Sequence, residues 1–240
     1  MQIKKTPGVV LLMVFGQLAV GGCGDSAGSD ESSAGGGAGG EPAAGGQGGS
    51  GGGAAVPSTF LVPNDGTSDF EGHTPRGFQG EGTGLFAGDN LNPSFPEGDG
   101  VHFFLTFDLA EVPPGSVVSA VLRSANAHES GAPYDDLGTL SASEIRFDAF
   151  SSALWDAPLL AGGASCDFAT SSTGPFECDL GDAVQRSLDD GYRYAQLRFD
   201  FDLAGDGDGS QDLASFYLGD PNQNEPGIFE LEVVVVPAGP

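Results

Sequence analysis

Three segments of the chain alternate apolar and polar residues, which is typical of β-strands with one face in a hydrophobic core. They cover residues 103–109, 192–202 and 227–236. The side chains expected to face the core are Phe103, Leu105, Phe107 and Leu109 in the first, Ala195, Leu197, Phe199 and Phe201 in the second, and Phe229, Leu231, Val233 and Val235 in the third.

A fourth strand is predicted just after the first, where alternation resumes beyond Pro113-Pro114-Gly115. Here Val118, Ala120 and Leu122 are expected to face inward. Proline has no N–H to donate to a sheet, so the two prolines end one strand and begin a rigid connection. Residues 103–123 are therefore expected to form a hairpin-like unit.

Weaker strand patterns occur at residues 60–62, 84–87, 141–150, 176–179 and 213–218. Residues 182–189 alone suggest a helix, with Ala183, Val184 and Leu188 on one side. Many short strands joined by Gly-, Asp- and Pro-rich connections predict an all-β fold, a jelly-roll-like antiparallel β-sandwich with one short helix.

The first 22 residues have the layout of a secretory signal peptide: two lysines, an apolar run over residues 9–20, and small residues before Cys23. The apolar run is too short for a convincing membrane span. Val20-Gly21-Gly22-Cys23 resembles a bacterial lipobox. That resemblance implies lipid attachment at Cys23, with acyl chains that hold the protein on a membrane. The alternative is an ordinary secretory signal that is cleaved near Gly22.

Residues 23–56 are rich in Gly, Ala and Ser and have no hydrophobic period, which predicts a disordered tether before a folded domain at 57–240. Residues 48–52 match the G-x-S-x-G hydrolase pattern, but no strand precedes them and no helix follows, so the match is due to chance. Gly24, rather than Asp, follows Cys23. By resemblance to Gram-negative lipoproteins, this implies a cell-envelope protein of the outer membrane.

The chain of 240 residues is strongly acidic, with 34 Asp and Glu against 8 Lys and Arg and a formal net charge of −26. Such a surface repels phosphate backbones, so nucleic-acid binding is not expected. It is compatible with cation binding or with neutral partners such as glycans. The acidity also has a simpler explanation, which is that it keeps the protein dispersed in water.

Residues 104–124 resemble the signature region of DNRLRE-type β-sandwich domains, which are related to carbohydrate-binding modules. The residues that carry the likeness are Phe107-Asp108-Leu109, Pro114-Gly115, Ser119-Ala120 and Leu122-Arg123. Residues 180–191, 214–217 and 229–236 are similar to the helix and final strands of that family. The resemblance implies a β-sandwich and a polysaccharide ligand.

Trp155, the sole tryptophan, could form a sugar-stacking platform together with Tyr134. The alternative is that Trp155 packs in the core or closes a sheet edge. Cys166 and Cys178 are an even pair in an exported chain, which predicts a disulfide.

Five aspartates crowd a glycine-rich stretch, as a calcium site would require: Asp200, Asp202, Asp206, Asp208 and Asp212. The alternative is a solvated acidic turn without metal. No other cofactor is expected.

His73, His102 and His128 stand apart in the sequence, and no catalytic motif accompanies them, so no catalytic residue is assigned. The predicted function is a lipid-anchored, non-catalytic surface module that binds extracellular or envelope polysaccharide. Two alternatives stay open: a structural or adhesive protein that binds other proteins, and a surface polysaccharide hydrolase or lyase. The sequence leaves the oligomeric state undetermined.

Overall fold

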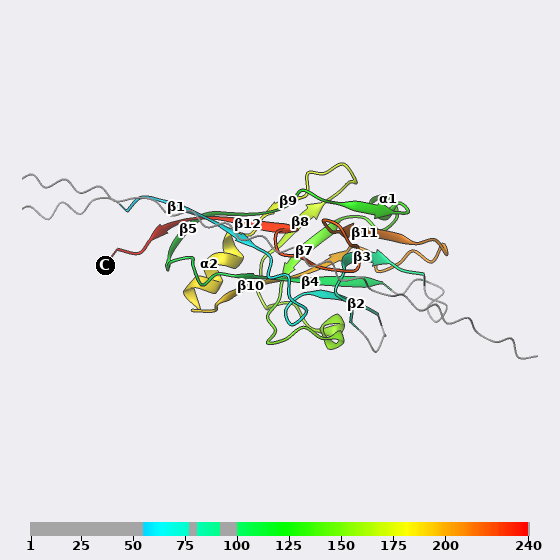
Figure 1. Cartoon of the computed structure of the whole chain (residues 1–240), viewed down its shortest axis with the longest axis horizontal. Coiled ribbons are helices and arrows are strands. Elements are labelled where there is room, and N and C mark those ends of the chain that lie inside the picture. Colours follow the sequence, from blue (N-terminus) through cyan, green and yellow to red (C-terminus); the bar gives the residue numbers. More distant parts are fainter. Residues whose placement is uncertain (1–54, 77–80, 92–99, 240) are drawn as a thin grey trace, which may run out of the picture. The chain divides into compact units, whose positions relative to one another are not determined.

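Two antiparallel sheets dominate the part of the chain that the computed structural model describes, residues 55–76, 81–91 and 100–239 (Figure 1). The smaller sheet has the strand order β1-β12-β5-β9. The larger has the order β6-β11-β3-β4-β10-β7-β8, and β2 also pairs with β4. The predicted all-β, sandwich-like fold of antiparallel sheets is confirmed.

The strands are β1 (Ser58–Pro63), β2 (Gly72–Pro75), β3 (Leu85–Asp89), β4 (Val101–Asp108), β5 (Gly115–Ser124), β6 (His128–Ser130), β7 (Leu140–Glu144), β8 (Ser165–Ala169), β9 (Glu177–Asp179), β10 (Tyr194–Phe201), β11 (Asp212–Phe216) and β12 (Phe229–Pro237). The helical elements are α1 (Pro133–Asp136), the 3₁₀ helix η1 (Ser152–Asp156) and α2 (Gly181–Asp189).

All of these elements belong to one compact unit, Gly52–Pro240. Because this unit contains every described strand and the whole described core, we expect it to fold without the residues before it. The predicted signal peptide, Cys23 and nearly all of the tether lie outside the described residues. Within the described residues, no helix has the length and apolar character needed to cross a membrane.

The core consists of aromatic rings from both sheets. Phe103 of β4 stacks on Phe199 of β10 with ring centroids 4.3 Å apart, and Phe229 of β12 lies 5.5 Å from Phe199. All twelve side chains that the alternation assigned to the core are buried, as predicted. The period-two pattern in these three strands therefore identified the surfaces that join the two sheets.

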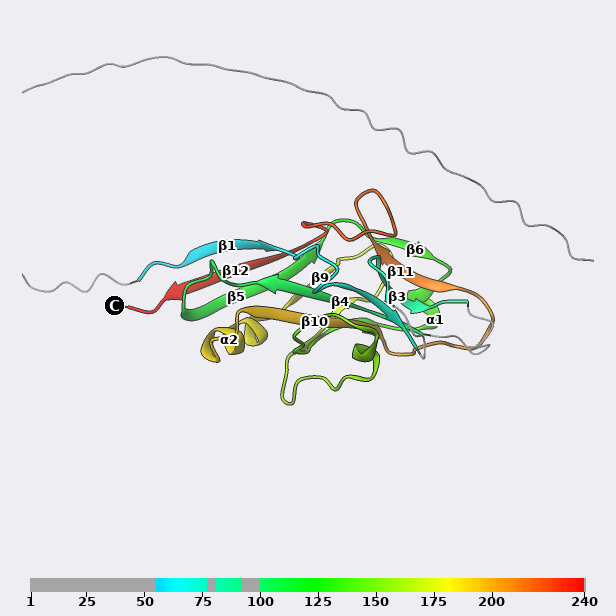
Figure 2. The same ribbon diagram turned by 60° about the horizontal axis from the view of Figure 1, so that its bottom comes forward.

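The predicted hairpin at residues 103–123 does not form. β4 belongs to the larger sheet and β5 to the smaller one, so the two strands lie in different layers (Figure 2). At the end of β4, the N–H of Leu109 still donates to the carbonyl of Arg193, 2.8 Å away, and the chain then crosses through Pro113 and Pro114. The prolines thus connect the two layers of the sandwich.

The predicted inward orientation of Val118 is also wrong, because its side chain is 60% exposed. Val234 of β12 pairs with Ser119, whereas the next residue, Val235, pairs with Val117. Val118 is therefore the extra residue of a β-bulge. The bulge reverses the alternation, and Val117 packs against the core in its place.

The outer face of β4 is covered by a second, smaller apolar cluster. Its buried members are Phe104, Ile145, Phe147, Phe150 and Leu154. The strand predicted over 141–150 ends at Glu144, because the residues that follow fold over this outer face. β4 is consequently buried on both sides, which explains why Phe104 occupies a position that alternation assigned away from the main core.

The predicted helix is present as α2, which packs against β5 and β10 with Ala183 and Val184 buried (Figure 2). The two other short helical segments, α1 and η1, were not predicted, and neither were the strands β2, β6 and β8. Each has five residues or fewer, too few for a hydrophobic period to develop.

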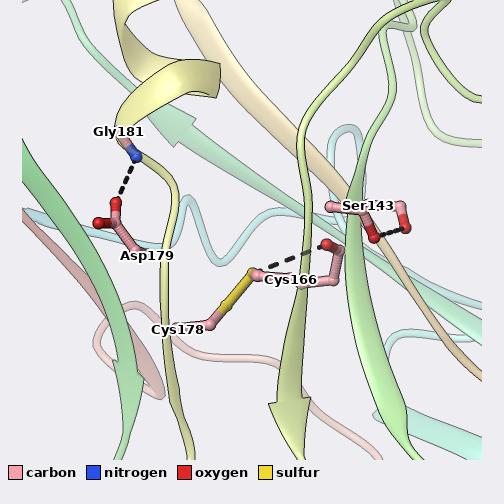
Figure 3. The surroundings of a disulfide bond; sticks show 7 residues. Ser143, Cys166, Cys178, Asp179 and Gly181 are labelled. Atoms are coloured by element: carbon pink, nitrogen blue, oxygen red, sulfur yellow. Dashed lines mark hydrogen bonds between the residues drawn. A yellow bond between two sulfur atoms is a disulfide. The ribbon is translucent and has the colours of Figure 1, made fainter.

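The predicted disulfide between Cys166 and Cys178 is confirmed (Figure 3). Cys166 lies in β8, an edge strand of the larger sheet, and Cys178 lies in β9, an edge strand of the smaller sheet. Beside it, the hydroxyls of Ser143 and Ser165 hydrogen-bond across β7 and β8 at 2.9 Å. The disulfide therefore joins the two layers at one edge of the sandwich.

Candidate functional site

Two adjoining hollows lie around α1 and combine aromatic, acidic and hydroxyl side chains. Their volumes are about 150 Å³ and 170 Å³. Glu129, Tyr134 and Ser172 line both. The remaining lining residues are Gly131, Ala132, Asp135, Thr170 and Ser171 in the first, and Ala127, His128 and Phe176 in the second. We call this pair of hollows the Tyr134 cleft.

The position of α1 follows from the pairing of β6 with β11. Gly131, just after β6, has a φ of +75°, and a Cβ there would lie 2.0 Å from the carbonyl oxygen of Gln211. Only glycine fits this turn. The N–H of Ala132 then donates to Asp212 Oδ1 at 2.6 Å, and Pro133 begins the helix. A short, well-fixed helix with acidic residues in its first turn results.

Tyr134 lies at the centre of the cleft and is only partly buried. Its ring packs edge-on to Phe201, 5.5 Å away, at the margin of the main core. Its hydroxyl is buried and has no hydrogen-bond partner among the described residues. Burial, with a further contribution from the charge of Glu129, raises the pKa of Tyr134 above its usual value. The hydroxyl is therefore neutral at physiological pH, and none of the described residues satisfies its hydrogen-bonding capacity.

A second pair of aromatic rings borders the cleft. His128 of β6 stacks on Tyr217, with ring centroids 3.9 Å apart and planes 13° from parallel. The cleft therefore combines aromatic surface with two carboxylates, Glu129 and Asp135, and with hydroxyl groups from the segment that follows β8.

Trp155, the other half of the predicted sugar platform, lies elsewhere. It stacks on His102 with centroids 3.6 Å apart. His102 is two residues before Phe104 in β4, so both side chains lie on the outer face of that strand. Tyr134 instead contacts Phe201 and the inner core. The two aromatic residues thus lie on opposite faces of the larger sheet, and the structure does not bring them together.

The five aspartates predicted as a calcium site also separate. Asp200 pairs with Arg198 at 2.8 Å on the outer face of β10, and Asp202 accepts the N–H of Thr139 at 2.9 Å. Asp208 accepts the N–H of Ser210 at 2.6 Å. Only Asp206 and Asp212 converge.

The third member of that convergence is Asp136 at the end of α1. One carboxylate oxygen from each of Asp136, Asp206 and Asp212 lies within 4.8 Å of the other two. The pKa of Asp136 is raised above its usual value. The largest cause is partial loss of water contact, and repulsion from Asp212, Asp206 and Asp208 adds to it. Asp136 was not predicted as a ligand, because only the pairing of β6 with β11 brings α1 beside the Asp206 segment.

Each of the three histidines lies against a different aromatic ring: His73 on Phe86, His102 on Trp155 and His128 on Tyr217. Burial, with a smaller effect of Arg198, lowers the pKa of His102 to about 3, so this ring is neutral. The contacts of His73 and His102 are those of packing residues.

A larger hollow of about 530 Å³ lies between β5 and the start of α2. Gln185, in its wall, accepts the N–H of Val117 at 2.7 Å and donates to the carbonyl of Gly115 at 3.1 Å. Gln185 thus fastens α2 to the bulged end of β5. No aromatic side chain lines this hollow, which makes it a poorer match for a sugar ring than the Tyr134 cleft.

Glu71 is fully buried, but its oxygens are occupied by the protein itself. They accept hydrogen bonds from the Asn64 side chain at 2.8 Å and from the N–H groups of Asp65, Gly66 and Thr106 at 2.8, 2.8 and 3.2 Å. Burial raises the pKa of Glu71 to about 7, although these hydrogen bonds oppose the shift. This arrangement organises a loop and leaves no oxygen for a substrate.

No protein-family model matches this chain, and a search of curated proteins finds no significant match. The likeness to DNRLRE-type domains therefore remains a prediction from the short motifs quoted above. Function must be inferred from the geometry of the Tyr134 cleft and its surroundings.

Proposed function

We propose that the folded unit is a non-catalytic binding module for a neutral extracellular or envelope polysaccharide, and that lipid on Cys23 holds it at the cell surface. The observation that carries this proposal is the Tyr134 cleft. A ligand site needs a concave surface with apolar contacts and a few polar groups that fix orientation, and the cleft offers both.

The chemistry of the cleft suits a sugar ring. The aromatic faces of Tyr134, His128 and Phe176 provide surface for the C–H face of a pyranose. The carboxylates of Glu129 and Asp135 accept hydrogen bonds from sugar hydroxyls, and serine and threonine hydroxyls both donate and accept. The unpartnered hydroxyl of Tyr134 would gain its missing hydrogen bond from such a ligand.

Charge and size narrow the class of ligand. With Glu129 and Asp135 in the cleft and a chain net charge of −26, a polyanionic glycan would be repelled. Each hollow is smaller than the roughly 300–1,000 Å³ of a site for a drug-sized ligand. The cleft would therefore hold one or two sugar units of a longer neutral chain.

A binding screen on immobilised glycans tests the proposal, with Gly52–Pro240 as the probe. Retention of the folded unit on one class of neutral polysaccharide supports it. Failure to bind any glycan would overturn it and would favour the adhesive alternative, in which the partner is another protein. Turnover of a bound polysaccharide would instead support the hydrolase or lyase alternative.

A further inference from the structure

The convergence of Asp136, Asp206 and Asp212 joins α1 to the segment that leads into β11, which is distant from α1 in the sequence. Asp136 ends α1, Asp206 lies in the connection between β10 and β11, and Asp212 begins β11. Their closest oxygens lie within 4.8 Å of one another, so one ion could contact all three carboxylates. We call these three residues the carboxylate cluster.

Asp212 supplies an independent reason to expect a ligand here. Its side chain is only 1% exposed. Oδ1 accepts the N–H of Ala132, but Oδ2 is buried and has no hydrogen-bond donor among the described residues. Leaving a buried carboxylate oxygen without a partner is unfavourable, and native proteins rarely do so. A cation would supply the missing partner.

Among the described residues, no arginine forms an ion pair with a member of the carboxylate cluster. Within the described residues, the ion-paired arginines contact carboxylates elsewhere: Arg123 with Glu177 and Glu232, Arg146 with Asp190, Arg186 with Glu144, Arg193 with Asp108 and Arg198 with Asp200. The chain has no lysine beyond residue 5. Three carboxylates whose oxygens lie within 4.8 Å of one another repel one another when they are ionised. A bound cation would relieve it.

We infer that Asp136, Asp206 and Asp212 bind a divalent cation, and that calcium is the preferred ion. The donor set consists of oxygen atoms alone, which favours a hard cation over zinc or copper. Calcium accepts irregular geometry with six to eight oxygens, so water can complete the shell around two exposed carboxylates and one buried one. Magnesium requires a tighter octahedron and is expected to bind more weakly.

The cation would tie α1 to the connection between β10 and β11. Because Tyr134 and Asp136 belong to the same four-residue helix, fixing Asp136 also fixes the wall of the Tyr134 cleft. This last consequence rests on the proposed function, whereas cation binding itself does not.

Calorimetric titration of metal-free Gly52–Pro240 with calcium chloride, and separately with magnesium chloride, tests the inference without any glycan. We expect one calcium per molecule with a dissociation constant of roughly 10⁻⁴–10⁻³ M, as in extracellular modules, and weaker binding of magnesium. Calcium at about 100 times that constant should stabilise the fold by roughly 2.7 kcal/mol and raise its Tm.

Three substitutions on the surface make the test specific. Asp136→Asn and Asp206→Asn each remove one charged ligand from an exposed position, so the fold should tolerate them, and each should weaken calcium binding about tenfold or more. Asp208→Asn is the matched control, because Asp208 lies in the same acidic segment but outside the cluster; it should change affinity less than about threefold. Equal effects of all three substitutions would overturn the inference, as would the absence of heat and of any Tm shift up to about 10 mM calcium.

Discussion

Tyr134 and Asp136 are two residues apart in α1, yet they contact different parts of the molecule. The ring of Tyr134 packs 5.5 Å from Phe201 at the margin of the core, while a carboxylate oxygen of Asp136 lies within 4.8 Å of one from Asp212. One short helix therefore connects the core, the cleft and the carboxylate cluster. Substitutions at either residue should therefore alter the geometry of the Tyr134 cleft.

Removing the hydroxyl of Tyr134 should weaken glycan binding without weakening the fold. Tyr134→Phe keeps the ring against Phe201 and deletes a buried group that has no partner in the described residues, so stability should stay equal or rise. The lost hydrogen bond to the ligand should reduce affinity about threefold to tenfold, as measured by titration with the polysaccharide found in the screen. Trp155→Phe, on the opposite face of the sheet, should leave affinity unchanged. If the Trp155 variant loses binding and the Tyr134 variant keeps it, the binding site is not the Tyr134 cleft.

Calcium should strengthen glycan binding. A chelator, or the Asp136→Asn substitution, should lower affinity for the polysaccharide because α1 loses its tie to the Asp206 segment. Paired titrations of the polysaccharide with calcium and with chelator measure this effect. The effects of the chelator and of Asp136→Asn should not be additive, because both remove the same bound cation. If the glycan affinity is equal in both conditions, the carboxylate cluster and the cleft are not coupled, even if calcium binds.

Glu71 should make stability decrease as the pH rises. Burial raises its folded-state pKa from 4.5 to about 7, so the folded state holds this proton more tightly than the unfolded state. The contribution is complete below the unfolded value and is lost as the pH passes through about 7, by an amount on the order of 3 kcal/mol. Urea unfolding of the wild type and of Glu71→Gln across this range isolates the effect. If the free energy of unfolding depends on pH in the same way for both proteins, the hydrogen bonds from Asn64 and the backbone keep Glu71 ionised.

Breaking the ion pair between Arg186 and Glu144 should be costly. The Glu144 side chain is only 3% exposed, and it also accepts the N–H of Ala164 at 3.0 Å. Arg186→Met leaves this carboxylate buried and unpaired, for an expected loss of about 3–5 kcal/mol in the free energy of unfolding. Arg193→Met is the control, because its pair with Asp108 is exposed, and it should lose less than about 1 kcal/mol. Similar losses in the two variants would refute a special role for the buried pair.

The Cys166–Cys178 disulfide should stabilise the sandwich by joining its two layers. Replacing both cysteines with serine opens a short loop, with a sequence separation of 12, and should lower the free energy of unfolding by about 3 kcal/mol on the chain-entropy model. Chemical reduction of the wild type should produce the same loss of stability. An unchanged unfolding midpoint in both cases would mean that the inter-sheet packing alone holds this edge.

The core could be read from the sequence because it depends on local alternation. Phe103, Phe199 and Phe229 each sit in a long strand whose own pattern shows which side is buried. Val118 was misassigned because its bulge is produced by the pairing with β12, which β5 alone does not encode. Likewise, the alternation on either side of Pro113 and Pro114 does not specify whether two successive strands pair within a sheet or face each other across the core.

The site was only partly predictable for the same reason. Tyr134, Asp206 and Asp212 carry recognisable chemistry and were identified, but Asp136 and Glu129 join them through the pairing of β6 with β11. β6 has three residues, too short to show a period in the sequence. Trp155 and Tyr134 were grouped by chemistry alone, and the large sheet separates them.

The most direct test of the proposed function is a glycan-array screen of Gly52–Pro240, performed with calcium and again with chelator, alongside the Tyr134→Phe variant. We expect binding to one class of neutral polysaccharide, and this binding should be weaker for the variant and in the presence of chelator. If the folded protein binds no glycan in either condition, the Tyr134 cleft is not a polysaccharide site.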